Sequence, residues 1–218
     1  MAVSICVIDY QKGNLASVQR GLADAGYDAF ISSDPADIMR ADGLVLPGVG
    51  SFADAMTTMN ELGQSEAVRK RVAQGTPFLG ICLGQQLIYE WGDEGCEEGQ
   101  RMAGLGLIEG VVERMPAFDD EGVKFKVPHV GWNSVEFVGS NPLFAGVESG
   151  SYFYFTHSYI GVPANKADIA GTTVHAQPFT SAVHHGNIYT TQFHPEKSSD
   201  IGMRVLANFG AIVEEACR

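Results

Sequence analysis

The stretch that decides the fold reads FLGICLGQQ, from Phe78 to Gln86. The apolar run Pro77–Ile81 is typical of a strand buried on both faces, and Leu83–Trp91 has the pattern of a helix. Cys82 lies between them in the pattern G-x-C-x-G, which has the form of a nucleophile elbow with sulfur in place of oxygen. Glycine is needed on both sides because side chains two residues from the nucleophile would collide in so tight a turn.

Strands and helices alternate through the first half of the chain. Ser51 can cap one of the helices, with Asp54 three residues on in the capping-box position. Alternation of this kind implies right-handed crossovers and a parallel sheet. Besides the pair around Cys82, the expected strands are Val3–Ile8, Tyr27–Ile31 and Gly43–Leu46, and the expected helices are Asn14–Ala25, Ser51–Met59 and Gln64–Gln74.

The second half instead reads as consecutive strands and a closing helix, Asp200–Ala216. A hairpin turn at His185–Asn187 joins the last two strands, and Gly186 supplies the positive φ. We therefore expect one domain, 1–218, with an open, mostly parallel α/β sheet, helices on both faces and antiparallel additions in the second half. The expected strands are Gly106–Met115, Val123–Val127, Ser134–Val138, Tyr152–Phe155, Ile169–Val174, Ser181–His184 and Ile188–Phe193.

Composition limits the classes of function. The 218 residues are 45% hydrophobic and carry a formal net charge of −12. The charge argues against binding nucleic acid or an anionic membrane, because both need clustered Lys and Arg. It is compatible with a small neutral substrate and a basic protein partner. Four scattered cysteines, no basic leader and no run of roughly 18–20 apolar residues indicate a cytoplasmic protein with reduced thiols.

A thiol nucleophile needs a base, and the base needs an orienting group. The segment QFHPE, Gln192–Glu196, contains both. Residues i and i+2 of an extended segment project to the same face, so Glu196 can hold one imidazole nitrogen of His194 while the other accepts the Cys82 proton. The alternatives are a surface H-x-E without a partner and a buried structural cysteine, which is how we interpret the other three cysteines.

Backbone amides near Cys82 can bind a developing oxyanion. The amide of Leu83 follows the nucleophile. A second donor, Val49, lies in the glycine-bounded loop Pro47–Phe52 between an expected strand and an expected helix. A phosphate-binding loop and an ordinary turn are the alternatives for this segment, although neither nucleotide-binding glycine motif is present. No residues have the spacing of zinc ligands, so we expect no metal.

These motifs together resemble the class I (triad) glutamine amidotransferases. Gly80–Gln86 looks like the nucleophile motif of that class, and His194–Glu196 looks like its base-and-orienter motif. Within the class, four further segments resemble the glutaminase subunits of imidazole glycerol phosphate synthase, an enzyme of histidine biosynthesis. They are Pro47–Phe52, Pro128–Asn133, Tyr154–Tyr159 and Lys197–Ser199.

The resemblance implies a flavodoxin-like sheet and hydrolysis of glutamine to glutamate and ammonia through a Cys82 thioester, with no cofactor. It implies an oxyanion strand at Pro47–Gly50, including Val49 and Gly50. It also implies a heterodimer with a cyclase subunit, which is a (β/α)-barrel that uses the ammonia. Positions that match substrate-binding residues are Gly48, Gln86, Glu94, Ser158 and Tyr159, and positions that match the partner interface are Asn14, Trp132, Asn133 and Lys197.

Three other functions remain open from the sequence. One is the glutaminase subunit of another class I amidotransferase, such as anthranilate or GMP synthase. A second is a cysteine peptidase or redox-responsive chaperone on a similar sheet, which would not explain the segments assigned to glutamine and to the partner. The third is a non-catalytic interaction subunit that has kept the fold.

Overall fold

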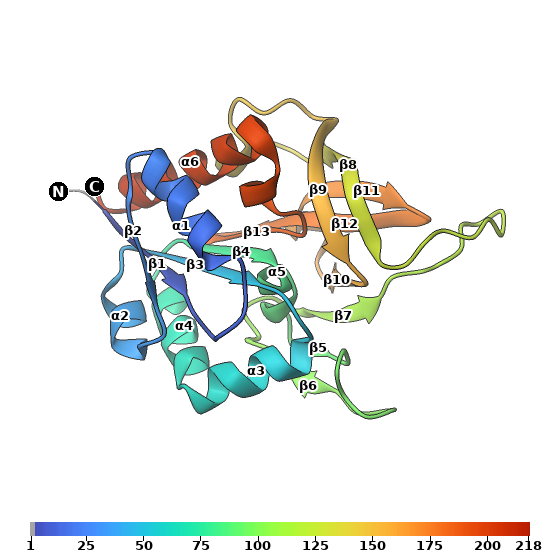
Figure 1. Cartoon of the computed structure of the whole chain (residues 1–218), viewed down its shortest axis with the longest axis horizontal. Coiled ribbons are helices and arrows are strands. Elements are labelled where there is room, and N and C mark those ends of the chain that lie inside the picture. Colours follow the sequence, from blue (N-terminus) through green and yellow to red (C-terminus); the bar gives the residue numbers. More distant parts are fainter. Residues whose placement is uncertain (1–2) are drawn as a thin grey trace.

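A nine-stranded sheet forms the centre of the computed structural model, which describes residues 3–218 (Figure 1). Its strand order is β2-β1-β3-β4-β13-β12-β11-β8-β9. The first five strands of this order pair in parallel, as the strand–helix alternation predicts. They are β2 (Asp28–Ser32), β1 (Ser4–Ile8), β3 (Gly43–Gly48), β4 (Phe78–Cys82) and β13 (Ile188–Thr191).

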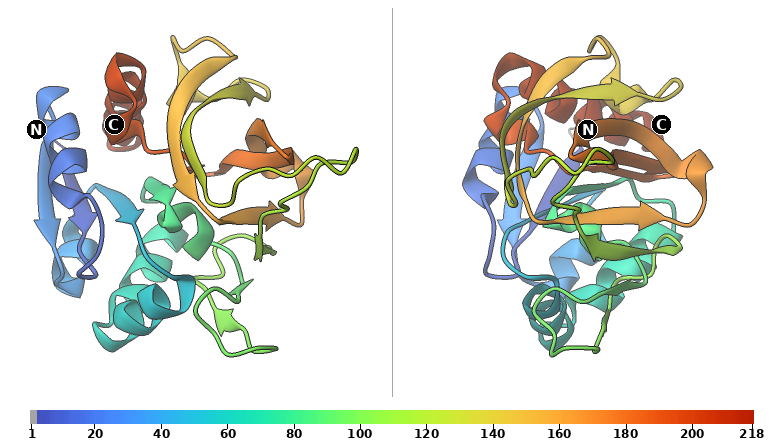
Figure 2. Two further views of the ribbon diagram at one scale, coloured as in Figure 1. Left: turned by 45° about the vertical axis from the view of Figure 1, so that its right-hand side comes forward. Right: turned by 90° about the vertical axis from the view of Figure 1, so that its right-hand side faces the viewer.

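The remaining strands of the sheet are antiparallel and come from the second half of the chain. Figure 2 shows that β8 and β9 curve strongly away from the parallel half. The predicted hairpin is confirmed, since His185 pairs with Ile188 and Gly186 has a φ of +58°. These strands are β12 (Gln177–His185), β11 (Ile169–His175), β8 (His129–Phe137) and β9 (Ser151–His157).

Helices cover both faces of the parallel half, because its strands are apolar on both sides. In β1, Ile5 and Val7 belong to one core while Cys6 and Ile8 belong to the other. Helices α1 (Leu15–Asp24) and α6 (Ser199–Ala216) cover the first core (Figure 1). The second core is covered by α2 (Pro35–Arg40), α3 (Phe52–Glu61), α4 (Gln64–Ala73) and α5 (Leu83–Leu87). The expected open α/β architecture is confirmed.

A second sheet of four short strands, in the order β10-β7-β5-β6, lies beside the end of α5. Sequence reasoning missed most of it. β10 contains Gly161 and ends at Pro163, a composition more typical of a loop. A side chain at Gly161 would lie 2.2 Å from the Tyr89 ring, so close packing explains this glycine. The strands are β10 (Tyr159–Pro163), β7 (Gly110–Arg114), β5 (Trp91–Gly92) and β6 (Met102–Ala103).

The predicted helix Leu83–Trp91 is too long. Helix α5 ends at Leu87, and Trp91 begins β5. The carbonyl groups of residues 87–90 instead accept hydrogen bonds from backbone N–H groups of residues 104–108. A tertiary contact therefore replaces the next helical turn, and apolar periodicity alone gives no sign of it.

Other boundaries differ as well. The predicted strand Val123–Val127 is wrong, because this segment forms only an isolated bridge between Phe118 and Lys124 in an exposed loop. The short helix α2 was missed, although Asp34 caps it by accepting from the Ala36 amide and Pro35 occupies its first position. By contrast, the Ser51 cap of α3 is confirmed by its hydrogen bond from the Asp54 amide.

Three 3-10 turns complete the described secondary structure: Pro142–Phe144, Lys166–Asp168 and Pro195–Lys197. None of the helices in residues 3–218 combines the length and the apolar character needed to cross a membrane.

The start of α6 packs against the turn that follows His194. A Cβ atom at Gly202 would lie 1.9 Å from the carbonyl oxygen of Pro195. We expect Gly202→Ala to lower the free energy of unfolding by about 1–3 kcal/mol, measured by urea denaturation, because overpacking forces the backbone apart.

A control on the same helix separates packing from helix propensity. Exposed Ala211→Gly should lower stability by about 1 kcal/mol through propensity alone. If propensity governed both sites, Gly202→Ala would raise stability by a similar amount, and that result would refute the packing account.

Candidate active site

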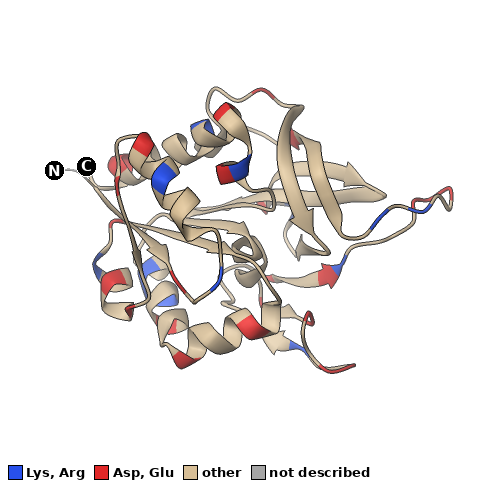
Figure 3. Ribbon diagram, viewed as in Figure 1, with Lys and Arg blue, Asp and Glu red and all other residues tan. Residues whose placement is uncertain are grey.

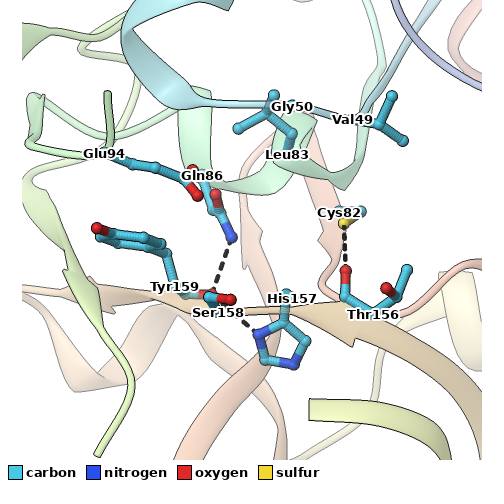
Figure 4. Close-up of a pocket in the computed structure, with 10 residues that line it drawn as sticks. All are labelled: Val49, Gly50, Cys82, Leu83, Gln86, Glu94, Thr156, His157, Ser158 and Tyr159. Carbon is cyan, nitrogen blue, oxygen red and sulfur yellow. Dashed lines mark hydrogen bonds between the residues drawn. The ribbon is translucent and has the colours of Figure 1, made fainter. Parts of the chain in front are cut away.

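Cys82 ends strand β4 and lies directly before α5, as the elbow motif predicts. Its φ of 56° and ψ of −106° place a non-glycine residue in a backbone region that side chains disfavour. Such strain persists only where the surrounding structure enforces it, and it is concentrated at functional sites. Cys82 is nearly buried, with its side chain at the edge of a cavity (Figure 4).

The glycines on either side of Cys82 allow this conformation. A Cβ atom at Gly80 would lie 2.6 Å from the Gly84 carbonyl oxygen. A Cβ atom at Gly84 would lie 1.8 Å from the Leu46 carbonyl oxygen of the neighbouring strand β3. The collision that the sequence predicts is therefore with backbone atoms, which cannot rotate away.

His194 and Glu196 meet as predicted. The Nδ1 atom of His194 donates to Oε1 of Glu196 at 2.8 Å, and both side chains are almost fully buried. The backbone holds the pair in place, because the His194 amide donates to the Tyr154 carbonyl and its own carbonyl accepts from the Ser198 hydroxyl. Since the carboxylate fixes the Nδ1–H tautomer, Nε2 is the nitrogen left to exchange a proton.

Opposing effects set the charge of His194. Burial lowers its pKa, but the neighbouring Cys82 thiolate and the Glu196 carboxylate raise it by more, to about 10. The imidazolium is thus the favoured form while the sulfur is ionised. Cys82 raises the pKa of His194 by its charge and by a hydrogen bond, and Nε2 is the nitrogen that Glu196 leaves open for this exchange.

A cavity of about 210 Å³ opens beside Cys82 (Figure 4). This volume lies below the roughly 300–1,000 Å³ of pockets for drug-sized ligands, and it suits a molecule the size of one amino acid. The cavity is lined by Val49, Gly50, Cys82, Leu83, Gln86, Glu94, Thr156, His157, Ser158 and Tyr159.

The three residues expected at the oxyanion site, Val49, Gly50 and Leu83, all line this cavity. Four of the five expected substrate-binding residues line it as well: Gln86, Glu94, Ser158 and Tyr159. The fifth, Gly48, is buried where β3 pairs with Cys82, and a Cβ atom there would lie 2.1 Å from the Tyr10 hydroxyl. The structure thus brings together segments from four distant parts of the sequence, although the role of each residue stays a prediction.

Gln86 and Glu94 differ in what they offer the cavity. The Gln86 amide group donates to the Tyr159 carbonyl at 2.9 Å (Figure 4). It also donates to Oε1 of Gln192 at 3.1 Å, so its own oxygen remains available to accept. Burial raises the pKa of the Glu94 carboxyl. Gln86 therefore presents an oxygen acceptor to a bound molecule, whereas Glu94 presents a carboxyl group whose burial favours the protonated form.

Sequence reasoning assigned no role to two residues that contact the Cys82 sulfur. The Sγ atom donates to the Thr156 carbonyl at 3.8 Å (Figure 4), and Nε2 of Gln192 donates to Sγ at 3.7 Å. Gln192 lies in the same short segment as His194 and is fully buried. The burial of this amide is a property of the fold, so no sequence pattern indicated its contact with Cys82.

The expected partner-facing residues do not all lie on one face. Trp132 is 52% exposed and packs edge-on against Tyr154. The Nζ atom of Lys197 lies over the ring of Tyr154 as well, 5.8 Å from its centroid. These side chains form one exposed group around Tyr154 beside the triad.

Asn14 and Asn133 contact the interior instead. Nδ2 of Asn14 donates to Oε1 of Glu196 at 3.3 Å, the same oxygen that His194 binds. Asn133 follows Trp132 on strand β8, so it points to the opposite face, where its amide lies 3.2 Å from Nε2 of His129. An interface role for either residue remains a prediction.

Charged residues lie mostly on helices and loops (Figure 3). Strand β9 carries none, and β8 carries only Glu136. The curved pair therefore offers a neutral, partly aromatic surface, with Val130, Trp132 and Tyr152 each more than half exposed. No cluster of His, Cys, Asp and Glu suitable for a metal ion occurs in residues 3–218.

The chain is similar to known proteins over nearly its whole length. A family model described as "Glutamine amidotransferase class-I" matches residues 6–213. The imidazole glycerol phosphate synthase subunit HisH of Moorella thermoacetica is 46% identical over 212 residues, covering 97% of this chain and 96% of that protein. HisH of Syntrophotalea carbinolica is 44% identical over 207 residues, covering 94% and 98%.

Solved structures support the fold. The PurLQS structure from Thermotoga maritima matches with a TM-score of 0.70 at 18% identity, covering 100% of both chains. A GMP synthase subunit from Thermoplasma acidophilum matches with a TM-score of 0.69 at 23% identity, covering 99% and 96%. The family match over nearly the whole chain, with a cysteine elbow and a His–Glu pair in the expected places, gives one conclusion: the chain belongs to the class I glutamine amidotransferases and is similar to the HisH subunits of imidazole glycerol phosphate synthase.

Proposed function

We propose that Cys82, His194 and Glu196 are the nucleophilic triad through which this chain hydrolyses glutamine to glutamate and ammonia. The observation that carries the proposal is the strained Cys82 elbow, which opens into an amino-acid-sized cavity beside the buried His194–Glu196 pair. The resemblance to HisH subunits supports glutamine as the substrate.

The reaction starts when the Cys82 thiolate attacks the side-chain amide carbon of glutamine. The amide groups of Leu83 and of the Val49–Gly50 segment stabilise the oxyanion that forms. Protonated His194 then donates its Nε2 proton to the leaving ammonia, and a γ-glutamyl thioester remains on Cys82. Water hydrolyses the thioester, with neutral His194 accepting the proton, and glutamate leaves.

A partner subunit uses the ammonia that this chain releases. The similarity to HisH supports a heterodimer with the cyclase subunit of imidazole glycerol phosphate synthase. In histidine biosynthesis, the cyclase uses ammonia to convert the phosphoribulosyl-formimino aminoimidazole carboxamide nucleotide. The products are imidazole glycerol phosphate and aminoimidazole carboxamide ribonucleotide. The Trp132–Tyr154–Lys197 group beside the triad is the surface we assign to this partner. Four free cysteines support a reducing, cytoplasmic location.

The alternative functions are less well supported. Relatives named HisH are 42–46% identical, whereas the GMP synthase structure from Thermoplasma acidophilum is 23% identical. A peptidase or chaperone would not account for the family match over residues 6–213. An interaction subunit would not need the His194–Glu196 contact to be buried and intact beside the cavity.

Removing the sulfur tests the triad. We expect Cys82→Ala to reduce glutamate release by about 10⁴-fold or more, because loss of a nucleophile removes the covalent route. The assay measures glutamate formed from glutamine, with the purified chain alone and with the cyclase and its nucleotide ligand. Exposed Cys217→Ala is the matched control and should retain activity. Full activity in Cys82→Ala would refute the triad.

The pH dependence tests the role of Glu196. Its carboxylate helps to raise the pKa of His194, so His194 remains protonated at neutral pH. In Glu196→Gln the pKa of His194 falls, and the alkaline limb of the kcat/KM profile should move to lower pH. The profile is measured in the presence of the cyclase. Exposed Glu214→Gln is the control, and an unshifted limb in Glu196→Gln would contradict the assignment.

Replacing Trp132 tests the surface that we assign to the cyclase. We expect Trp132→Ala to weaken cyclase binding by about 10- to 100-fold, because exposed aromatic residues often dominate interface energy. Calorimetric titration with the cyclase measures the affinity. Trp91→Ala removes the other tryptophan, which is 45% exposed on the smaller sheet, and should leave the affinity unchanged. Equal effects of the two substitutions would disprove a specific role for Trp132.

A further inference from the structure

We propose that Gln192 is a further catalytic residue, whose side-chain amide donates to the Cys82 sulfur and stabilises its thiolate form. The inference deepens the proposed glutaminase function and rests on it for the identity of the reaction. It starts from the 3.7 Å contact between Nε2 of Gln192 and Sγ of Cys82, made by a side chain that is 0% exposed.

The orientation of the Gln192 amide follows from its neighbours. The Tyr159 carbonyl can only accept, so Gln86 must turn its NH2 group toward it, at 2.9 Å. The same NH2 group lies 3.1 Å from Gln192, which must therefore present its oxygen to Gln86. The NH2 group of Gln192 is then left on the other side, facing the sulfur. One fixed backbone carbonyl thus sets the direction of both amides.

The two contacts of the sulfur respond oppositely to ionisation. As a thiol, Cys82 donates to the Thr156 carbonyl at 3.8 Å. When the proton leaves for His194, that hydrogen bond is lost and the carbonyl dipole disfavours the negative sulfur. The contact from Gln192 strengthens, because hydrogen bonds to ionised acceptors are roughly twice as strong as neutral ones. Gln192 therefore shifts the equilibrium toward the thiolate.

Gln192 can act on substrate binding only through Gln86. It does not line the cavity, whereas Gln86, which donates to it, does. Its amide contacts Gln86 and Cys82, and both of these residues line the cavity. A change at Gln192 should therefore alter kcat more than KM.

The competing explanation is packing: a buried glutamine that only joins Gln86 to the sheet. The Gln192 backbone is already fixed to the neighbouring strand without its side chain, because the Gln192 amide nitrogen donates to the Ser181 carbonyl at 2.8 Å. A packing role predicts changes in stability but no change in how readily Cys82 ionises. The pH dependence of Cys82 reactivity therefore separates the two explanations.

The test is the pH profile of Cys82 alkylation by iodoacetamide, followed by mass spectrometry of the Cys82 peptide in the full chain. Gln192→Met removes the donor at similar size, and Gln192→Asn withdraws it by one methylene with less risk to folding. We expect the midpoint of alkylation to rise by about one pH unit, a tenfold loss of thiolate at a given pH. With the cyclase present, kcat should fall by about 10- to 100-fold and KM should change little.

Ser181→Ala is the matched control, because Ser181 has a buried hydroxyl without a hydrogen-bond partner among the described residues and lies on the neighbouring strand. It should leave the midpoint unchanged. An unchanged midpoint in folded Gln192→Met and Gln192→Asn, verified by urea denaturation, would overturn the inference. Because alkylation needs no glutamine, a shifted midpoint in a chain that releases no glutamate would support Gln192 and reject the proposed function.

Discussion

The close approach of β3, β4 and α5 is the constraint on which the site depends. Helix α5 can start immediately after β4 only if nothing projects from Gly80 and Gly84, since a Cβ at Gly84 would lie 1.8 Å from a β3 carbonyl. This packing forces Cys82 to a positive φ and turns its sulfur out of the sheet toward the cavity. Two apolar cores, one on each face of the parallel strands, hold the arrangement rigid.

The sequence predicted what depends on local pattern. The parallel strands, the Cys82 elbow, the Ser51 cap and the His194–Glu196 contact follow from apolar runs, glycine spacing and side-chain reach along an extended segment, and the structure has each of them. These features are encoded within a few residues, so local sequence patterns are enough to predict them.

Features that depend on distant segments were missed or wrong. Helix α5 ends early because the N–H groups of residues 104–108 donate to the carbonyl groups of residues 87–90. The glycine in β10 is explained only by its close contact with the Tyr89 ring. The contact between Gln192 and the Cys82 sulfur was missed for the same reason, because the two residues lie 110 positions apart in the sequence. Neither apolar periodicity nor motif spacing contains information about such contacts, because each is made between segments whose own patterns are those of an ordinary loop, strand or helix.

A chain of hydrogen bonds with fixed directions links strand β8 to the same site. Burial lowers the pKa of His129 to about 4 and that of His157 to about 3, so both rings are neutral and each has one donor and one acceptor nitrogen. Nδ1 of His157 must donate to the Tyr159 carbonyl, so its Nε2 accepts from His129, whose Nε2 accepts from Asn133. The Tyr159 carbonyl also accepts from Gln86, and its two lone pairs are thereby both used. Because this carbonyl can only accept, neither the Gln86 amide nor the Gln192 amide can turn without leaving a buried polar group unpaired, which costs more than one hydrogen bond contributes.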